Sequence, residues 1–227
     1  MTKEEILKFI SENQGEQLLD FYDKTYEKLK DLNRRIDKIS LFLIVLVFLY
    51  FIASSATISS FSIGPIAISD ISLISQLIPI LFAWQLLDLA ITSGHKSELH
   101  TTVKFLFLSI YKQDVNPKDL ETGGFNVFTR IILPFSYTHE LSKFSKEKKI
   151  NIAIGCLGGL LVIPLLLLIF LPFYFEYYML KEVYFKYYST TFGKLSFYSS
   201  LWIIAMVFYY YINTTFLALK NYKAGRV

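Results

Sequence analysis

This chain of 227 residues is poor in cysteine and in charge. Its one cysteine, Cys156, lies inside a long apolar run, so an intrachain disulfide is impossible and the thiol is most simply a small buried residue. Charged residues make up 19% of the sequence, whereas soluble domains average about 25%. This deficit, together with a hydrophobic fraction of 53%, is typical of a membrane protein.

The sequence also lacks the motifs that accompany common catalytic sites. It contains no phosphate-binding glycine loop, no nucleophile elbow and no H-E-x-x-H pattern. His95 and His100 are five residues apart, which does not match the helical spacing of paired metal ligands, and His139 is isolated. We therefore expect no enzyme activity, no metal and no cofactor.

Long uncharged windows dominate what remains. A helix that crosses the hydrocarbon core of a bilayer needs roughly 20 mostly apolar residues. The windows predict an all-α membrane protein with four spans, near Ser40–Thr57, Ile71–Ile91, Ile150–Leu171 and Ser196–Leu217. The acidic N-terminal segment does not resemble a signal peptide, so we expect the first span to be an uncleaved anchor.

The distribution of Lys and Arg predicts the topology, because basic residues next to spans prefer the cytoplasm. Of the 23 Lys and Arg, all but Lys181, Lys186 and Lys194 lie on one side of the predicted spans. We expect both termini and the central loop to be cytoplasmic. The expected parts are a stalk (1–39), a first hairpin of spans (40–91), a central loop with amphipathic helices (92–149), a second hairpin of spans (150–219) and a basic tail (220–227).

A heptad seam begins in the charged N-terminal half. A short helix is expected to break near Asn13 and Gly15, and a long helix follows from about Glu16. Apolar-type side chains then recur at alternating steps of three and four, at Tyr22, Thr25, Leu29, Leu32, Ile36, Ile39, Leu43 and Leu46. Two interpretations are open: the seam joins copies of the chain in a stalk through Tyr22, Leu29, Leu32, Ile36 and Ile39, or it packs on the central loop of its own subunit.

The second predicted span carries unusual polar side chains. Gln85, Asp88 and Thr92 follow steps of three and four, so they share one helical face, and Gln76 lies nearer the start of the span. Asp88 is the only charged residue within a predicted span, which makes it a functional-site hypothesis by default. These four residues are the candidates for a pore lining, although water or Lys96 could also satisfy Asp88 at the cytoplasmic end.

Three further patterns give weaker indications. A basic cluster could bind an anionic nucleotide, oligonucleotide or phospholipid, or could serve topology alone; it consists of Lys28, Lys30, Arg34, Arg35 and Lys38. Gly155 and Gly159 form a small-xxx-small pair that allows close helix packing. Aromatic residues crowd the segment 173–192, which is expected to be an outer loop lying at the lipid interface.

In span number, size, short cytosolic helical region and composition rich in Phe, Tyr, Lys and Ile, the chain resembles the compact multi-span membrane effectors of bacterial anti-phage systems. The resemblance is one of layout and carries over no functional residue. It implies a multi-pass protein of the bacterial inner membrane that acts as a gated ion channel or pore. We expect a homo-oligomer in membrane lipid, with a tetramer as one option, controlled by an anionic ligand or a cytoplasmic protein. The alternative is a non-conducting scaffold or immunity-type protein that binds a partner.

Overall fold

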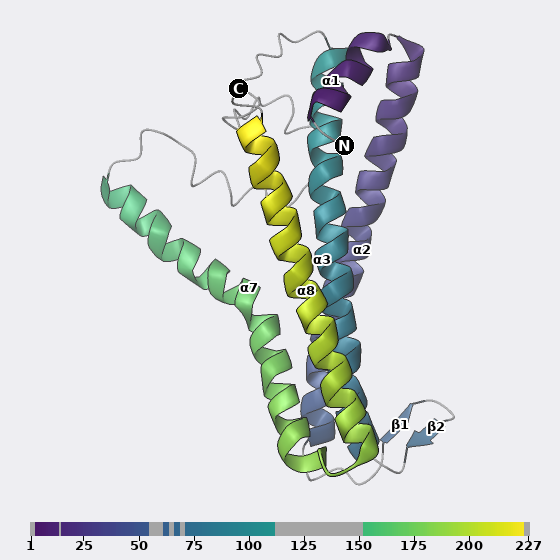
Figure 1. Cartoon of the computed structure of the whole chain (residues 1–227), viewed down its shortest axis with the longest axis vertical. Helices are drawn as coiled ribbons and strands as arrows, with labels where there is room; N and C mark the ends of the chain where they lie inside the picture. The colour runs from purple at the N-terminus through teal and green to yellow at the C-terminus, as the bar shows by residue number, and fades with distance from the viewer. Residues whose placement is uncertain are drawn as a thin grey trace. The chain divides into compact units, whose positions relative to one another are not determined.

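The computed structural model describes the backbone of residues 3–13, 15–54, 61–63, 66–68, 71–111 and 152–224, and side chains within 5–54, 72–111 and 170–217 (Figure 1). These residues are almost entirely helical, as predicted for the all-α class. The elements in chain order are α1 (Lys3–Glu12), α2 (Glu16–Ser54), β1 (Phe61–Ile63), β2 (Ile66–Ile68), α3 (Ile71–Ile110), α7 (Ile152–Tyr187) and α8 (Thr191–Ala224).

Three helices are long and apolar enough to cross a membrane. They are Glu16–Ser54 in α2, Ser72–Ile110 in α3 and Thr191–Leu217 in α8. The fourth expected span falls on α7, whose helix begins at Ile152, but the side chains of residues 152–169 lie outside the described part of the chain. Three of the four predicted spans are therefore confirmed by length and composition.

The N-terminal helices begin and end where the residue pattern predicts. α1 ends at Glu12, and the side-chain amide of Asn13 donates a hydrogen bond to the carbonyl oxygen of Phe9. Gly15 has a φ of 69°, a left-handed conformation that glycine adopts without steric cost. α2 starts at the next residue and continues for 39 residues, so the charged and the apolar halves of the sequence belong to one helix.

The two short strands are a feature that the residue pattern does not predict. They pair in antiparallel fashion, with Phe61 opposite Ile68 and Ile63 opposite Ile66. The sequence between α2 and α3 indicates only a turn at Gly64-Pro65, because the apolar and polar residues on either side alternate over too few positions to mark a strand.

The chain divides into two compact units. Unit 1 comprises Met1–Arg34 and Ser93–Leu166, and its described part is held by aromatic and aliphatic packing. The ring of Phe9 lies 4.7 Å from that of Phe21, and Tyr22 lies 6.3 Å from Phe107, measured between centroids. Burial, followed by the influence of nearby Tyr26, Tyr111 and Asp23, raises the pKa of Tyr22 to about 12, so its phenol is neutral at physiological pH.

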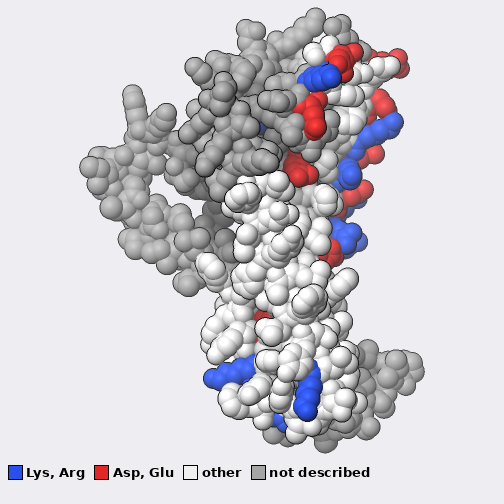
Figure 2. Space-filling view, in the orientation of Figure 1, with Lys and Arg blue, Asp and Glu red and all other residues white. Residues whose placement is uncertain are grey.

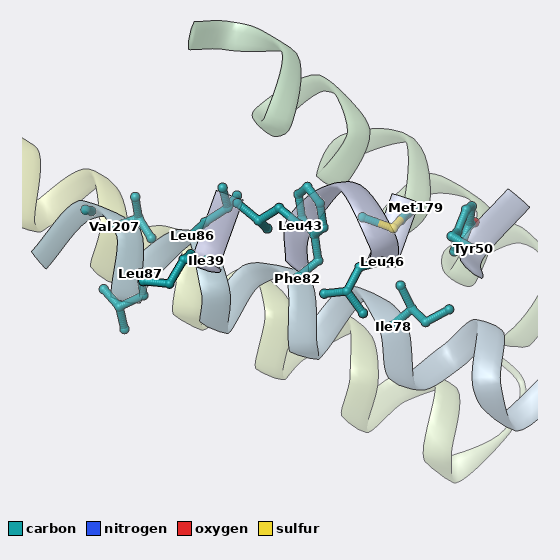
Figure 3. Close-up of a cluster of buried hydrophobic side chains, with 11 residues drawn as sticks. Ile39, Leu43, Leu46, Tyr50, Ile78, Phe82, Leu86, Leu87, Met179 and Val207 are labelled. Carbon is teal, nitrogen blue, oxygen red and sulfur yellow. The ribbon is translucent and has the colours of Figure 1, made fainter. Parts of the chain in front are cut away.

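Unit 2 comprises Arg35–Thr92 and Leu167–Val227 and has a continuous apolar core. α2, α3, α7 and α8 all contribute to this core (Figure 3). Its buried members are Ile39, Leu43, Leu46, Tyr50, Ile78, Phe82, Leu86, Leu87, Ala90, Met179 and Val207. Among the three helices that are long and apolar enough to cross a membrane, α3 is the most buried. In its most apolar stretch 50% of the residues are buried, against 22% in α2 and 17% in α8. The remaining faces of α2 and α8 are apolar and exposed.

A tight turn joins α7 to α8, and it corrects the expected outer loop. Most of the aromatic segment 173–192 is helical, because α7 continues to Tyr187 and α8 begins at Thr191. Pro172 lies inside α7 rather than at its end; neighbouring groups can compensate a proline within a membrane helix. The aromatic side chains therefore cover helix faces, and α7 extends about 24 Å beyond Leu171, the predicted end of its span, at 1.5 Å per residue.

The turn depends on a cap and on one glycine. The Thr190 hydroxyl accepts a hydrogen bond from the backbone N–H of Gly193 at 3.0 Å, as an N-cap residue does for the first turn of a helix. A Cβ atom at position 193 would lie 2.0 Å from the backbone carbonyl oxygen of Tyr187. Only glycine fits at this position.

We expect Gly193→Ala to destabilise the protein more than Gly15→Ala. The first substitution forces backbone displacement and should cost about 3 kcal/mol. The second leaves open space around the new Cβ and costs about 1 kcal/mol for the left-handed backbone. Thermal unfolding of the two purified variants in detergent checks the order, and equal losses would contradict this account of the turn.

Candidate functional site

One end of unit 2, predicted to be the inner one, contains an ion pair between two side chains that the residue pattern assigns to separate roles. The Arg35 guanidinium on α2 donates a hydrogen bond to the Asp88 carboxylate on α3 at 2.7 Å. The Thr92 hydroxyl donates to the same carboxylate at 3.3 Å. Asp88 is 25% exposed and Thr92 is buried. The partner of Asp88 is thus Arg35, a member of the basic cluster.

Gln76 lies at the opposite end of the α3 span and connects three segments. Its side-chain amide donates to the carbonyl oxygen of Ser72, and its side-chain oxygen accepts a bond from Thr190 in the α7–α8 turn. Its backbone carbonyl accepts a bond from the buried Ser196 hydroxyl on α8. Gln76 therefore joins α3 to the second hairpin, and Gln85, one of the other stripe candidates, is half-buried.

A second charged cluster occupies the opposite end of unit 2, predicted to be the outer one. The Tyr50 hydroxyl on α2 donates a hydrogen bond to Glu182 on α7 at 2.5 Å. The Lys186 ammonium, one turn further along α7, pairs with the same carboxylate. Tyr50 is buried and belongs to the apolar core, so this cluster links the core to the outer surface.

Glu176 is the most unusual side chain in the described part of the molecule. It is 2% exposed, and neither carboxyl oxygen has a hydrogen-bond partner among the described residues. It shares the buried face of α7 with Met179, Leu180 and Val183, at helical steps of three, four and seven. A buried polar group without a partner costs free energy, so this carboxyl group requires a functional or structural reason.

The contacts of α7 place Glu176 between the two ends of unit 2. Glu182 is level with Tyr50 through their hydrogen bond, and Tyr50 lies one turn before the end of α2. Glu176 precedes Glu182 by six residues, or about 9 Å along the helix. Arg35 and Tyr50 are separated by about 22 Å on α2, so Glu176 lies about 13 Å from the level of the Arg35–Asp88 pair. The hydrocarbon core is about 30 Å thick.

Known proteins provide no guide to this site. No protein-family model, no curated protein and no solved structure matches the chain. The function must be argued from the residues themselves.

The heptad seam is buried within the single chain at several positions. Leu29 in unit 1 is 0% exposed, and Ile39 in unit 2 belongs to the apolar core. Tyr22, Leu32 and Ile36 are half-buried. This arrangement favours the interpretation in which the seam packs within its own subunit, because a side chain with no exposed surface has none to offer a second copy. Self-association through other surfaces stays a prediction.

The basic cluster is exposed but does not form a purely positive surface. Lys28, Lys30, Arg34 and Lys38 are exposed, and acidic side chains alternate with basic ones along this side of the molecule (Figure 2). Arg34 lies 3.7 Å from Asp31. These acidic neighbours weaken the attraction of the basic cluster for an anion. They favour the interpretation in which the cluster only sets the topology. Gly155 and Gly159 lie in α7, but their side-chain surroundings are outside the described residues.

The residue pattern misses Glu176 and the Tyr50–Glu182–Lys186 cluster. Pro172 and the following aromatic residues suggest the end of a span, so both acidic residues fall in the expected loop. One signal was available: Glu176, Met179, Leu180 and Val183 follow a helical period that continues through the aromatic residues.

We expect Arg35 and Asp88 to stabilise unit 2 as a pair. Arg35→Gln and Asp88→Asn should each destabilise the protein, and the double variant should lose less than the sum, with a coupling of about 1 kcal/mol. Thermal unfolding in detergent at low and high salt measures this cycle. Additive losses at both salt concentrations would show that the pair contributes nothing.

Proposed function

We propose that this protein is an ion-conducting, multi-pass protein of the bacterial inner membrane that acts as a homo-oligomeric effector in anti-phage defence. The observation that carries the conduction is a set of buried polar side chains that unit 2 contains in addition to its apolar core. Its buried polar side chains extend from the outer end to the inner end, at Ser75, Gln76, Thr92, Glu176, Ser196 and Ser200.

Polar and ionisable groups within a membrane are expensive and mark ion pathways in many membrane proteins. Packing alone does not require Glu176, because an apolar side chain at this position would avoid the cost of burying a carboxyl group. The paired Asp88 at one end and the paired Glu182 at the other leave this unpaired acid between them. Such a series is expected of a path for cations or protons.

The packed core of unit 2 corresponds to a closed state in this proposal. Leu43, Leu46 and Phe82 fill the space between α2 and α3 (Figure 3). Conduction then requires these helices to separate or shift, and the Arg35–Asp88 and Tyr50–Glu182 contacts are the ones such a movement would strain. The exposed apolar faces of α2 and α8 are available to lipid and to neighbouring subunits, which supports a homo-oligomer, with a tetramer as one option.

Control is assigned to unit 1 in this proposal. Its α1 helix packs on the start of α2 through Phe9 and Phe21, outside the apolar windows of the spans. Its exposed surface carries charges of both signs, which suits a cytoplasmic protein partner better than an anionic nucleotide or oligonucleotide. The setting in anti-phage defence is supported by the resemblance in layout.

One surface favours the alternative function, a non-conducting scaffold or immunity-type protein. A shallow apolar groove of about 430 Å³ lies between α3 and α8. It is lined by Leu87, Ile91, Trp202, Ala205, Met206, Tyr209 and Tyr210. A membrane helix of a partner could pack there, and a scaffold of this kind would carry no current.

We expect vesicles that contain the purified protein to pass ions when a membrane potential is applied, and expression in bacteria to depolarise the inner membrane. Vesicles without protein are the control. Asp88→Asn should alter the flux, because it releases Arg35 at the inner end of the path. The scaffold would be the better proposal if two results were found together. The vesicles would pass no ions at any potential, with or without anionic ligands, and expression would leave the membrane potential of cells unchanged.

We also expect both termini and the central loop to be cytoplasmic. A reporter that is active only outside the inner membrane should be active when fused after Gly64 and inactive when fused after Gly124. A cytoplasm-active reporter at the same two positions is the matched control. The reverse pattern would contradict the proposed topology.

A further inference from the structure

The surroundings of Glu176 are unusually free of charge. The parts of α2, α3 and α8 that cross unit 2 contain no charged residue in the stretches 39–54, 71–87 and 195–217. The charged residues nearest to Glu176 and to these stretches along the four packed helices are Lys181, Glu182 and Lys186 on α7, Asp37 and Lys38 on α2, Asp88 on α3 and Lys194 on α8. Asp88 and Glu182 are each engaged in an ion pair, and Lys181, Asp37, Lys38 and Lys194 are exposed.

An ionised carboxylate in such a place has no cation to balance it. The cost of burying an isolated charge is many kcal/mol, and a group in this position takes up a proton instead. A bound metal cation is a poorer fit, because such ions take several oxygen ligands. The neighbours of Glu176 on its buried face, Met179, Leu180 and Val183, offer no side-chain oxygen.

We propose that Glu176 is a proton-binding site at membrane depth and that the proton is the ion this protein transfers. This proposal rests on the proposed ion conduction and identifies the conducted ion as the proton. Release of the proton passes it to water and leaves a carboxylate on Glu176, which is stable only where water reaches it. Asp88 and Glu182 stay paired and take up no proton. Glu176 thus holds one proton about 9 Å from the outer cluster and about 13 Å from the inner pair.

Both distances exceed the length of a hydrogen bond. The closed structure therefore stores the proton, and transfer requires water or a movement of α7 that brings Glu176 towards one end. Proton transfer is therefore gated by α7. The movement that carries Glu176 towards one end would also break the hydrogen bond between Tyr50 on α2 and Glu182 on α7.

A hydrophobic carbodiimide tests the site directly, because it dissolves in lipid and reacts with protonated carboxyl groups. The reagent is dicyclohexylcarbodiimide, applied to the full chain in phosphatidylethanolamine and phosphatidylglycerol vesicles, with peptide mass spectrometry to locate the modification. We expect labelling at Glu176 that declines as the pH rises, because the reagent reacts with the protonated form. Glu176→Gln should abolish this labelling, and Glu182→Gln should leave it unchanged.

The absence of labelling at Glu176 at every pH, or protection by sodium ions at constant pH, would overturn the proton site. Folding is checked with the same variants. Glu176→Gln resembles the protonated acid in shape and charge, so it should fold and be at least as stable as the wild type near neutral pH, because an unfolded Glu side chain is already ionised there. It should also lose less stability than the wild type as the pH rises.

Flux measurements separate this inference from the proposed function. A pH-sensitive dye inside the vesicles should report proton flux that Glu176→Gln lowers by roughly tenfold or more, whereas Glu176→Asp retains part of it. If the wild type passes potassium and Glu176→Gln passes ions equally well, conduction stands and the proton inference fails. If no ion passes but labelling follows the expected pattern, Glu176 remains a proton-binding site. The proposals of conduction and of proton transfer then both fail.

Discussion

The packing of α3 against three neighbouring helices is the interaction on which unit 2 depends. α3 contributes Ile78, Phe82 and Leu86 to the apolar core, and its polar groups reach partners on every side. Asp88 pairs with α2 and Gln76 binds the α7–α8 turn and α8. A bilayer provides no water to satisfy such groups, so a polar residue on a central helix must find its partner in protein.

This constraint explains why most of the polar stripe has a structural role. Asp88 and Gln76 each bind another segment, and they align α3 with its neighbours at the two ends of the span. Glu176 differs because it is buried more deeply than Asp88 but lacks a hydrogen-bond partner in the described part of the chain. The contrast between a satisfied and an unsatisfied acid within one bundle is what directs attention to α7.

Helix formation and membrane insertion depend on local and compositional properties, and these were predictable. The turn at Gly15, the start of α2 near Glu16 and the continuation of α3 beyond the second span all follow from residue types and spacing. The end of α7 was mispredicted, because Pro172 and the aromatic residues after it suit an interface as well as a helix packed against α8. Whether the heptad seam packs within or between chains was equally undecided, since either partner would bury Leu29.

The amino-acid sequence by itself determined that this is a helical protein with segments long and apolar enough to cross a membrane, because helix formation and apolar length depend on local composition and need no knowledge of packing. The tertiary structure alone decided which polar residues have partners. Arg35 meets Asp88 across 53 positions, and Tyr50 meets Glu182 across 132. Such pairs are set by how the helices align, and so is the isolation of Glu176.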